Sequence, residues 1–365
     1  MSIDALLRPF SSPKLSLKNR IIMAPMTRRF SPGGVPGADV AEYYRRRAQG
    51  GVALIITEGT TINHPAASFD TSVPNFYSDE ALQGWQQVVD AVHGAGGKIA
   101  PQLWHVGAAR RPGTGPFPEH PTATPSGYVT PDKLLTEPLT AVEIDAIVKG
   151  FADAAGNARR LGFDAVEIHG AHGYLVDNFL WEGLNRRKDG YGGSRAGRSR
   201  FGAEIVQAVR AEVGEDFPVI FRFSQWKQQD YSARLASNPD ELLEALAPLS
   251  ETGVDIFHCS TRRFWEPEFE GSTLNLAGWT RKLLGKPAIT VGSVSLDEEF
   301  ITTFRGGEAS SADIGDLLRR MEADEFDLVA IGRALIANPD WVALMQQGRA
   351  EELKTYEKNL LEHLI

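Results

Sequence analysis

Two histidines and a tyrosine lie close together near the middle of the chain, as His169, His172 and Tyr174. Paired imidazoles can bind zinc or iron, or both can donate hydrogen bonds to one substrate oxygen, as in an oxyanion hole. In the second interpretation Tyr174 is a proton donor, because an unperturbed phenol, with a pKa of about 10, keeps its proton at neutral pH. A single buried histidine is more often structural, but two beside a tyrosine favour a catalytic role.

A second candidate site lies near the end of the sequence, where two apolar runs are each followed by glycine. The first run leads into Gly292 and Ser293, and the second leads into Gly332 and Arg333. Glycine lets backbone amides approach an anion closely, and the guanidinium of arginine matches the oxygens of a phosphate. These segments predict a phosphate site. Since no second glycine-rich fingerprint is present, a mononucleotide suits the site better than a dinucleotide.

The elements that must position these residues alternate regularly. Eight short, mostly apolar runs are typical of parallel strands covered on both faces. The predicted strands are Arg20–Ala24, Val52–Glu58, Lys98–His105, Asp164–Gly170, Val219–Ser224, Asp255–Ser260, Ala288–Gly292 and Leu328–Gly332. The predicted helices are Val40–Gln49, Asp79–Gly94, Thr140–Leu161, Arg198–Val213, Pro239–Glu251, Asn275–Leu284, Asp313–Met321 and Asn338–Gly348. Thr140 and Glu143 have the spacing of a capping box.

This alternation fits either an open, doubly wound sheet or a closed barrel. An open dinucleotide-binding sheet normally carries Gly-x-Gly-x-x-Gly after its first strand, and the sequence contains no such hexapeptide. The sequence therefore predicts an α/β fold, a single (β/α)8 TIM barrel over residues 1–365. Barrels of this kind carry their catalytic groups where strands end and the following loops begin. His169, His172, Gly292 and Gly332 all fall at such positions.

Two long excursions interrupt the alternation. Residues 110–139 contain seven of the 21 prolines, which excludes a regular helix. This segment follows the third strand and is predicted to be a lid or insertion at the catalytic end. Asn185–Gly197, after the fourth strand, is rich in glycine and arginine. Because the chain has a net charge of −9, we attribute its basic residues to local ion pairs rather than to nucleic-acid binding.

Composition and motifs exclude several classes of protein. The acidic balance works against a nucleic-acid or anionic-membrane partner, and the lone Cys259 excludes an internal disulfide and cysteine-based metal clusters. No signal peptide or membrane-spanning stretch is apparent, so a cytoplasmic location is expected. Glycosidases need two opposed carboxylates, whereas Glu58 is the only obvious acid at a strand end. His-Glu-x-x-His, Walker and Gly-x-Ser-x-Gly motifs are absent from the sequence.

Several longer motifs resemble the old yellow enzyme family of flavin-dependent ene-reductases. The similarity runs from Leu17 to Trp341, nearly the whole chain. The most specific segments are Met23–Arg28 (MAPMTR), Gln102–Gly107 (QLWHVG) and Val166–Leu175 (VEIHGAHGYL). The glycine- and arginine-rich segment after the fourth strand also matches the family. Its matching residues are Asn185, Arg187, Asp189, Tyr191, Gly192, Gly193, Ser194, Arg198, Arg200 and Phe201.

The resemblance implies an NAD(P)H-dependent flavin oxidoreductase that binds FMN and uses NADH or NADPH to reduce activated C=C bonds. Its partner would be a small electrophilic alkene, namely an α,β-unsaturated ketone, an aldehyde or a nitroalkene. His169 and His172 would bind the substrate oxygen. Tyr174 would protonate the α-carbon while the hydride from flavin N5 reaches the β-carbon, and Trp104 would line the substrate pocket.

The resemblance also implies the residues that bind FMN. They are Pro25, Met26, Thr27, Gly59, Gln102, Arg222, Gly292, Ser293, Gly332 and Arg333. Thr27 would bond the ring carbonyl near N5, Gln102 would meet the pyrimidine edge, and Arg222 would stabilise the reduced ring near N1. Residues 292–293 and 332–333 would hold the phosphate, which agrees with the independent interpretation above.

Two segments depart from the family pattern, Gln225–Arg234 and His258–Glu270, and both are expected to shape the pocket. Two other functional classes stay open at this point. A metal-dependent hydrolase would use His169 and His172 as ligands, and a flavin-storage protein would bind FMN without turnover. The resemblance is compatible with a homo-oligomer, because members of the family occur as monomers, dimers and tetramers.

Overall fold

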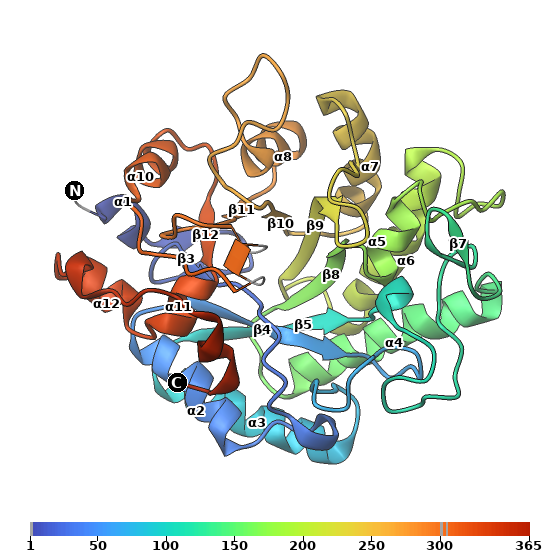
Figure 1. The fold of residues 1–365 in the computed structure, drawn as a ribbon, viewed down its shortest axis with the longest axis horizontal. Helices are drawn as coiled ribbons and strands as arrows, with labels where there is room; N and C mark the ends of the chain where they lie inside the picture. The colour runs from blue at the N-terminus through green and yellow to red at the C-terminus, as the bar shows by residue number, and fades with distance from the viewer. Residues whose placement is uncertain (1–2, 300–301, 304–305) are drawn as a thin grey trace.

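A closed barrel of eight parallel strands forms the centre of the computed structural model, which describes residues 3–299, 302–303 and 306–365. Each strand pairs with the next barrel strand along the chain, and the last pairs with the first (Figure 1). The strands are β3 (Ile21–Met23), β4 (Leu54–Thr61), β5 (Lys98–Trp104), β8 (Val166–His172), β9 (Val219–Lys227), β10 (Ile256–Ser260), β11 (Ala288–Val291) and β12 (Leu328–Ile331). All eight predicted strands are present, so the predicted (β/α)8 fold is confirmed.

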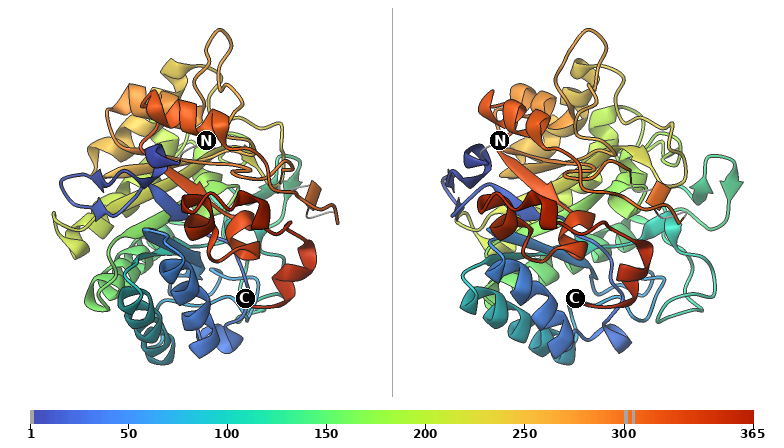
Figure 2. Two further views of the ribbon diagram at one scale, coloured as in Figure 1. Left: turned by 90° about the vertical axis from the view of Figure 1, so that its left-hand side faces the viewer. Right: turned by 60° about the vertical axis from the view of Figure 1, so that its left-hand side comes forward.

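Helices surround the barrel and cover the outer faces of its strands (Figure 2). The longer ones are α2 (Ala38–Gln49), α3 (Asp79–Gly94), α4 (Ala141–Arg160), α6 (Arg195–Val213), α7 (Pro239–Glu251), α8 (Leu276–Leu284) and α10 (Gly315–Glu322). Shorter ones are α1 (Asp4–Leu7), α5 (Leu175–Leu180), α11 (Arg333–Ala337) and α12 (Trp341–Gln346). The predicted capping box of Thr140 and Glu143 is present at the start of α4. Within the described residues, no helix combines the length and the apolar character needed to cross a membrane.

The end of the barrel opposite the candidate site is closed by apolar side chains. A small hairpin of β1 (Phe10–Ser11) and β2 (Ser16–Leu17) precedes the first barrel strand. Its buried Phe10 and Leu17 belong to the same apolar cluster as interior strand residues such as Leu54 and Ile220. Burial of this cluster stabilises the barrel by the hydrophobic effect and leaves the carboxyl ends of the strands for polar groups.

One predicted helix is wrong in its extent. The predicted helix Asn338–Gly348 is shorter in the structure, where α12 spans Trp341–Gln346. Asn338 has extended rather than helical dihedrals, as expected for a residue before proline. The side chain of Asn338 makes two hydrogen bonds with a segment later in the chain: it accepts from the Lys354 amide and donates to the Lys354 carbonyl.

Residues 110–139 have no α-helix and contain the short hairpin of β6 (Tyr128–Thr130) and β7 (Lys133–Leu134) (Figure 1). The buried guanidinium of Arg110 holds the start of the segment by donating to the carbonyls of Thr114, Phe117 and His120. Arg110 also donates to the Ser68 carbonyl. These four hydrogen bonds from one guanidinium hold the segment in place where regular secondary structure is lacking. The role of this segment as a lid stays a prediction.

The basic residues after β8 are engaged locally, as predicted. Arg187 pairs with Asp189 at 2.6 Å and also donates to the carbonyls of Pro125 and Leu139. Arg200 pairs with Glu204 at 2.7 Å. The loop is therefore tied to the protein itself through its arginines.

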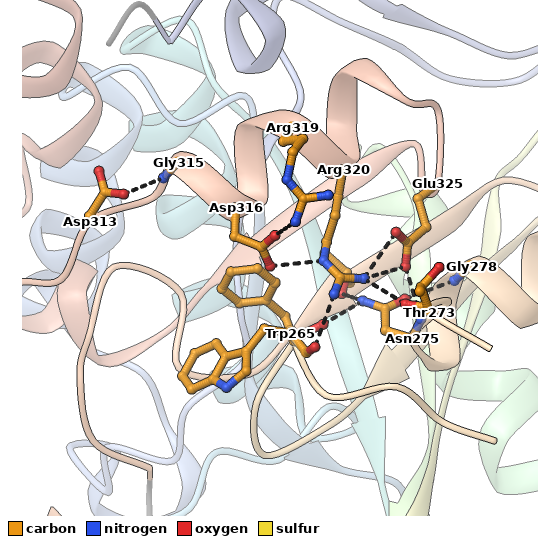
Figure 3. A network of polar contacts seen from close by, with 12 residues as sticks. Trp265, Thr273, Asn275, Gly278, Asp313, Gly315, Asp316, Arg319, Arg320 and Glu325 are labelled. Carbon is orange, nitrogen blue, oxygen red and sulfur yellow. Dashed lines mark hydrogen bonds and ion pairs between the residues drawn. The ribbon is translucent and has the colours of Figure 1, made fainter. Parts of the chain in front are cut away.

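The segment between β10 and α8 is anchored from outside the barrel by Arg320 on α10 (Figure 3). Its guanidinium donates to the carbonyls of Trp265 and Thr273 and pairs with Glu325 at 3.0 Å. The Glu325 carboxylate in turn accepts from the amide of Asn275. These contacts fix much of the segment His258–Glu270, which departs from the family pattern. The segment lies beside the carboxyl end of β11, because Phe264 donates its amide proton to the Gly292 carbonyl.

Candidate active site

The end of β8 and the turn that leads into α5 carry the three residues singled out first, with His169 and His172 on the strand and Tyr174 after it. His172 has a φ of +64° and Gly173 a φ of +78°, so two successive residues adopt left-handed conformations. Such a conformation costs free energy for a residue with a side chain and persists only where its surroundings enforce it. An added Cβ on Gly173 would also lie 1.9 Å from Oε1 of Gln229, so that flexible side chain would have to move.

Buried polar groups enforce this turn. The His172 amide donates to Oγ of Ser224 at 2.9 Å, and the Gly173 amide donates to Oδ2 of Asp177 at 2.7 Å. Oδ1 of Asp177 lies 2.6 Å from Nζ of Lys227, and both side chains are fully buried. Burial raises the pKa of Asp177 and lowers the pKa of Lys227, while their mutual attraction opposes both shifts.

The side chains of this turn meet in an aromatic group with Trp104. The ring centroid of His169 lies 5.2 Å from that of His172 and 5.0 Å from that of Tyr174. The indole of Trp104 packs edge-on against Tyr174 at 4.8 Å. The structure thus brings together the four residues assigned to substrate and proton transfer.

Both imidazoles are neutral around pH 7. Burial, followed by the nearby charge of Arg222, places the pKa values of His169 and His172 well below their usual range. Nδ1 of His169 accepts from the Ala171 amide, so its proton lies on Nε2. A neutral imidazole with a fixed proton is a hydrogen-bond donor without being a charged group. In the described part of the chain, no group of three or more His, Cys, Asp or Glu side chains is arranged to hold a metal ion.

Polar groups continue from the turn across the barrel interior. Strand register places His169 beside Arg222 and Arg222 beside His258. Arg222 donates to Oγ of Ser260 at 3.2 Å, and the same hydroxyl lies 2.7 Å from Nε2 of His172. The Nε group of Arg222 is buried and has no hydrogen-bond partner. A guanidinium in this state requires an acceptor to offset its lost hydration.

A second chain of contacts begins at Gln102. Its Nε2 donates to Oε1 of Glu167 at 2.7 Å, and Oε2 of Glu167 lies 2.7 Å from Nδ1 of His258. Nε2 of His258 is buried and unpartnered. Glu167 is not among the site residues predicted from the sequence, and His258 is covered only by the segment His258–Glu270, which is expected to shape the pocket.

These groups fit a flavin ring. The free Nε–H of Arg222 is a donor for an anionic ring edge. Gly59 lets the indole of Trp104 pack directly on the backbone of β4, since a Cβ there would lie 2.5 Å from a ring carbon of Trp104. Pro25 and Met26 are half-buried after β3, and Thr27 is exposed. Met26 lies near the second glycine segment, because a Cβ on Gly332 would lie 3.4 Å from its sulfur.

The residues predicted to bind phosphate also come together. The Nη2 group of Arg333 lies 3.2 Å from Oγ of Ser293 and donates to the Glu298 carbonyl at 2.6 Å. Gly292 has a φ of +143°, and a Cβ there would lie 2.7 Å from the Thr261 carbonyl oxygen, so only glycine fits. The loops after β11 and β12 therefore converge as the sequence predicted.

Glu58, the lone acid at a strand end, supports the segment that follows β3. Its Oε2 accepts from the amides of Arg28 at 2.8 Å and Arg29 at 3.2 Å. Burial raises the pKa of this carboxyl to about 7. Glu58 therefore fixes the backbone that follows Pro25, Met26 and Thr27.

The residues that hold the turn after β8 are not among the site residues named individually from the sequence, although Lys227 and Ser260 lie in the two segments expected to shape the pocket. They are Asp177, Ser224, Lys227 and Ser260. A serine or lysine in an apolar strand such as β9 is itself a sign of a buried polar role. Partners of such residues come from other strands, which no local pattern identifies.

Comparison with known proteins agrees with this arrangement. The NADH:flavin oxidoreductase / NADH oxidase family matches residues 5–352. The NADH oxidase of Thermoanaerobacter brockii is 34% identical over 353 residues, covering 93% of this chain but 50% of that protein. The chain thus spans about half the length of that relative. The 12-oxophytodienoate reductase 7 of Oryza sativa subsp. japonica is 35% identical over 361 residues, covering 92% of this chain and 86% of that protein.

Solved structures give the same result. Morphinone reductase in complex with tetrahydroNAD is similar with a TM-score of 0.81 and 30% identity, covering 98% of this chain and 93% of that one. Old Yellow Enzyme from a Pichia species is similar with a TM-score of 0.80 and 26% identity, covering 98% and 90%. The expected class, an oxidoreductase, is confirmed. The chain belongs to the NADH:flavin oxidoreductase / NADH oxidase family, as its resemblance to old yellow enzyme indicated.

Proposed function

We propose that the chain is an FMN-dependent NAD(P)H oxidoreductase that reduces the activated C=C bond of an α,β-unsaturated ketone, aldehyde or nitroalkene. The observation that carries the proposal is the meeting of His169, His172 and Tyr174 beside a buried guanidinium, Arg222, whose Nε lacks a partner. Two neutral donors next to a phenol suit a substrate oxygen that gains negative charge and a neighbouring carbon that gains a proton.

The two imidazoles bind the substrate oxygen. Nε2–H of His169 donates one hydrogen bond. Ser260 accepts from Arg222 and has its own proton to donate to Nε2 of His172; in that tautomer Nδ1–H of His172 is the second donor. Both bonds strengthen as the oxygen gains charge, and loss of one such donor should cost about 3 kcal/mol in the transition state.

FMN, when bound, supplies the hydride for the β-carbon. Arg222 would face the ring near N1, and Gln102 would meet the pyrimidine edge through Oε1, because its Nε2 is engaged by Glu167. Pro25, Met26, Thr27 and Gly59 would lie against the ring. Residues 292–293 and 332–333 would hold the phosphate. Tyr174 delivers the proton to the α-carbon, and Trp104 lines the substrate pocket.

NADH or NADPH is the proposed reductant, supported by the similar morphinone reductase, whose solved structure is a complex with tetrahydroNAD. The proposed location is the cytoplasm. A homo-oligomer stays a prediction.

The visible spectrum of the purified protein, recorded before and after anaerobic addition of NADH or NADPH, tests the proposal. A yellow preparation that bleaches with nicotinamide and recovers its colour with cyclohexenone supports it. A yellow protein that does not react with the alkene would be a flavin-storage protein. Failure to take up FMN, together with stoichiometric zinc, would favour the metal-dependent hydrolase.

The role of Tyr174 is tested separately by the two half-reactions. Tyr174→Phe should slow reoxidation by the alkene and leave flavin reduction by NAD(P)H nearly unchanged. Equal slowing of both half-reactions would contradict a role as proton donor.

A further inference from the structure

Four consecutive residues at the end of β9 and the start of the next loop, Trp226–Gln229, adjoin the turn that carries His172 and Tyr174. We name them the clamp segment. The indole of Trp226 stacks on the imidazole of His172 with ring centroids 4.5 Å apart. The Gln228 amide donates to the His172 carbonyl at 3.2 Å. Nε2 of Gln229 donates to the Gly173 carbonyl at 2.8 Å.

The clamp segment is itself firmly held. Nζ of Lys227 bonds Asp177 at 2.6 Å and the Ser224 carbonyl at 3.0 Å, and the Lys227 side chain is fully buried. On the solvent side, the ring of Tyr231 stacks on Trp226 at 5.5 Å. The backbone on both sides of Gln228 is therefore fixed relative to the catalytic turn.

From this position Gln228 reaches the phenol. Its Nε2 donates to Oη of Tyr174 at 2.9 Å. A phenol oxygen carries one proton and accepts at its lone pairs, so a donor on the oxygen obliges the phenol proton to point away from Gln228. The ring cannot swing freely, because Trp104 and His169 pack against it.

We propose that Gln228 is a positioning residue that directs the Tyr174 proton toward the substrate and stabilises the oxygen as that proton leaves. This inference rests on the proposed function. A hydrogen bond to a phenolate is stronger than one to a neutral phenol, so the contribution of Gln228 grows along the transfer. The side chain of Gln228 is exposed, so it links the phenol oxygen to solvent.

Other groups also face Tyr174. Burial raises the pKa of the phenol, and the Gln228 donation is the largest opposing influence, followed by the charges of Arg29 and Arg222. Tyr231 acts in the same direction as burial. Among these groups, removal of Gln228 should therefore raise the pKa of the phenol most, since the two arginines lower it only through their charge.

The experiment combines Gln228→Leu and Tyr174→Phe singly and together in the FMN-loaded protein. Reoxidation by cyclohexenone should slow about tenfold in Gln228→Leu, the size expected for one hydrogen bond to a charged group. The double variant should be no slower than Tyr174→Phe alone, because without the phenol Gln228 has nothing to direct. Flavin reduction by NAD(P)H should be unchanged. Gln83→Leu, which removes another exposed amide side chain, on α3, is the matched control and should behave as the unchanged protein.

A second readout does not depend on turnover. The protein is labelled with 3-fluorotyrosine, and the ¹⁹F resonance that disappears in Tyr174→Phe is assigned to Tyr174. Its pH titration gives the pKa of this phenol. That pKa should rise in Gln228→Leu but not in Gln83→Leu. An unchanged pKa would overturn the inference and leave the proposed function standing. Faster reoxidation in Gln228→Leu would overturn it too, since the amide would then withhold the proton. Unchanged reoxidation in Tyr174→Phe would overturn the proton-donor role and the inference together.

Discussion

Arg333 holds a loop together and, in the proposed function, binds an anion as well. Its guanidinium bridges Ser293 and the Glu298 carbonyl after β11, although it is itself the first residue of α11. Burial lowers its pKa from the ordinary value, with Tyr356 and nearby carboxylates opposing the shift. A cation in such surroundings gains from an anionic partner, and a phosphate between the two glycine segments would supply one.

Arg333→Ala should therefore weaken FMN binding about 100-fold, since two hydrogen bonds to a charged group contribute roughly 1.5 kcal/mol each. Fluorescence titration of the apoprotein with FMN measures the change. Arg333→Lys keeps the charge but not the planar guanidinium, so its affinity for FMN should lie between those of the unchanged protein and Arg333→Ala. Full retention of flavin by Arg333→Ala after dialysis would show that the phosphate lies elsewhere.

At the scale of elements, β8 and β9 act as one unit. The buried pair of Asp177 and Lys227 links the end of β9 to the helix that follows β8, and the same pair fixes the left-handed turn at the end of β8. Removing one partner of a buried ion pair leaves a charge without compensation, whereas removing both can be much less harmful.

Lys227→Met should lower the free energy of unfolding by about 3–5 kcal/mol, because the carboxylate of Asp177 is then buried alone. The double variant Lys227→Met with Asp177→Asn should recover part of this loss, since the substituted amide would be uncharged and could still accept from the Gly173 amide. Urea unfolding followed by circular dichroism checks both. Additive losses in the double variant would mean that the two residues do not act as a pair.

The eight strands could be predicted because each is a short apolar run, and burial on both faces imposes that composition. The predicted helix Asn338–Gly348 begins too early, although Pro339 already disfavours helical dihedrals at Asn338; the contact of Asn338 with Lys354 is what its neighbours do not reveal. The same distinction applies to the site. Glycine and arginine after two strands predict a phosphate loop by their types, while Ser224, Ser260 and Lys227 acquire their roles only when strands close into a barrel.

At the scale of the whole molecule, the barrel separates stability from chemistry. The hairpin β1–β2 closes one end with apolar side chains, and the polar groups of the site occupy the other. In barrels of this kind, residues of the amino-terminal face contribute to stability, whereas catalytic groups gather at the carboxyl ends of the strands. A substitution at the closed end should therefore change unfolding without changing the reaction.

Phe10→Ala tests this separation. Phe10 is 4% exposed and lies in the interior cluster with Leu54 and Ile220, so its truncation leaves a cavity and should cost about 3–5 kcal/mol of unfolding free energy. The flavin spectrum and the rates of both half-reactions should match those of the unchanged protein at temperatures where the variant stays folded. Phe117→Ala is the matched control, because that ring is 42% exposed and its loss should cost little. A slower alkene half-reaction in folded Phe10→Ala would show that packing at the closed end reaches the catalytic turn, and the two ends would then have to be treated as coupled.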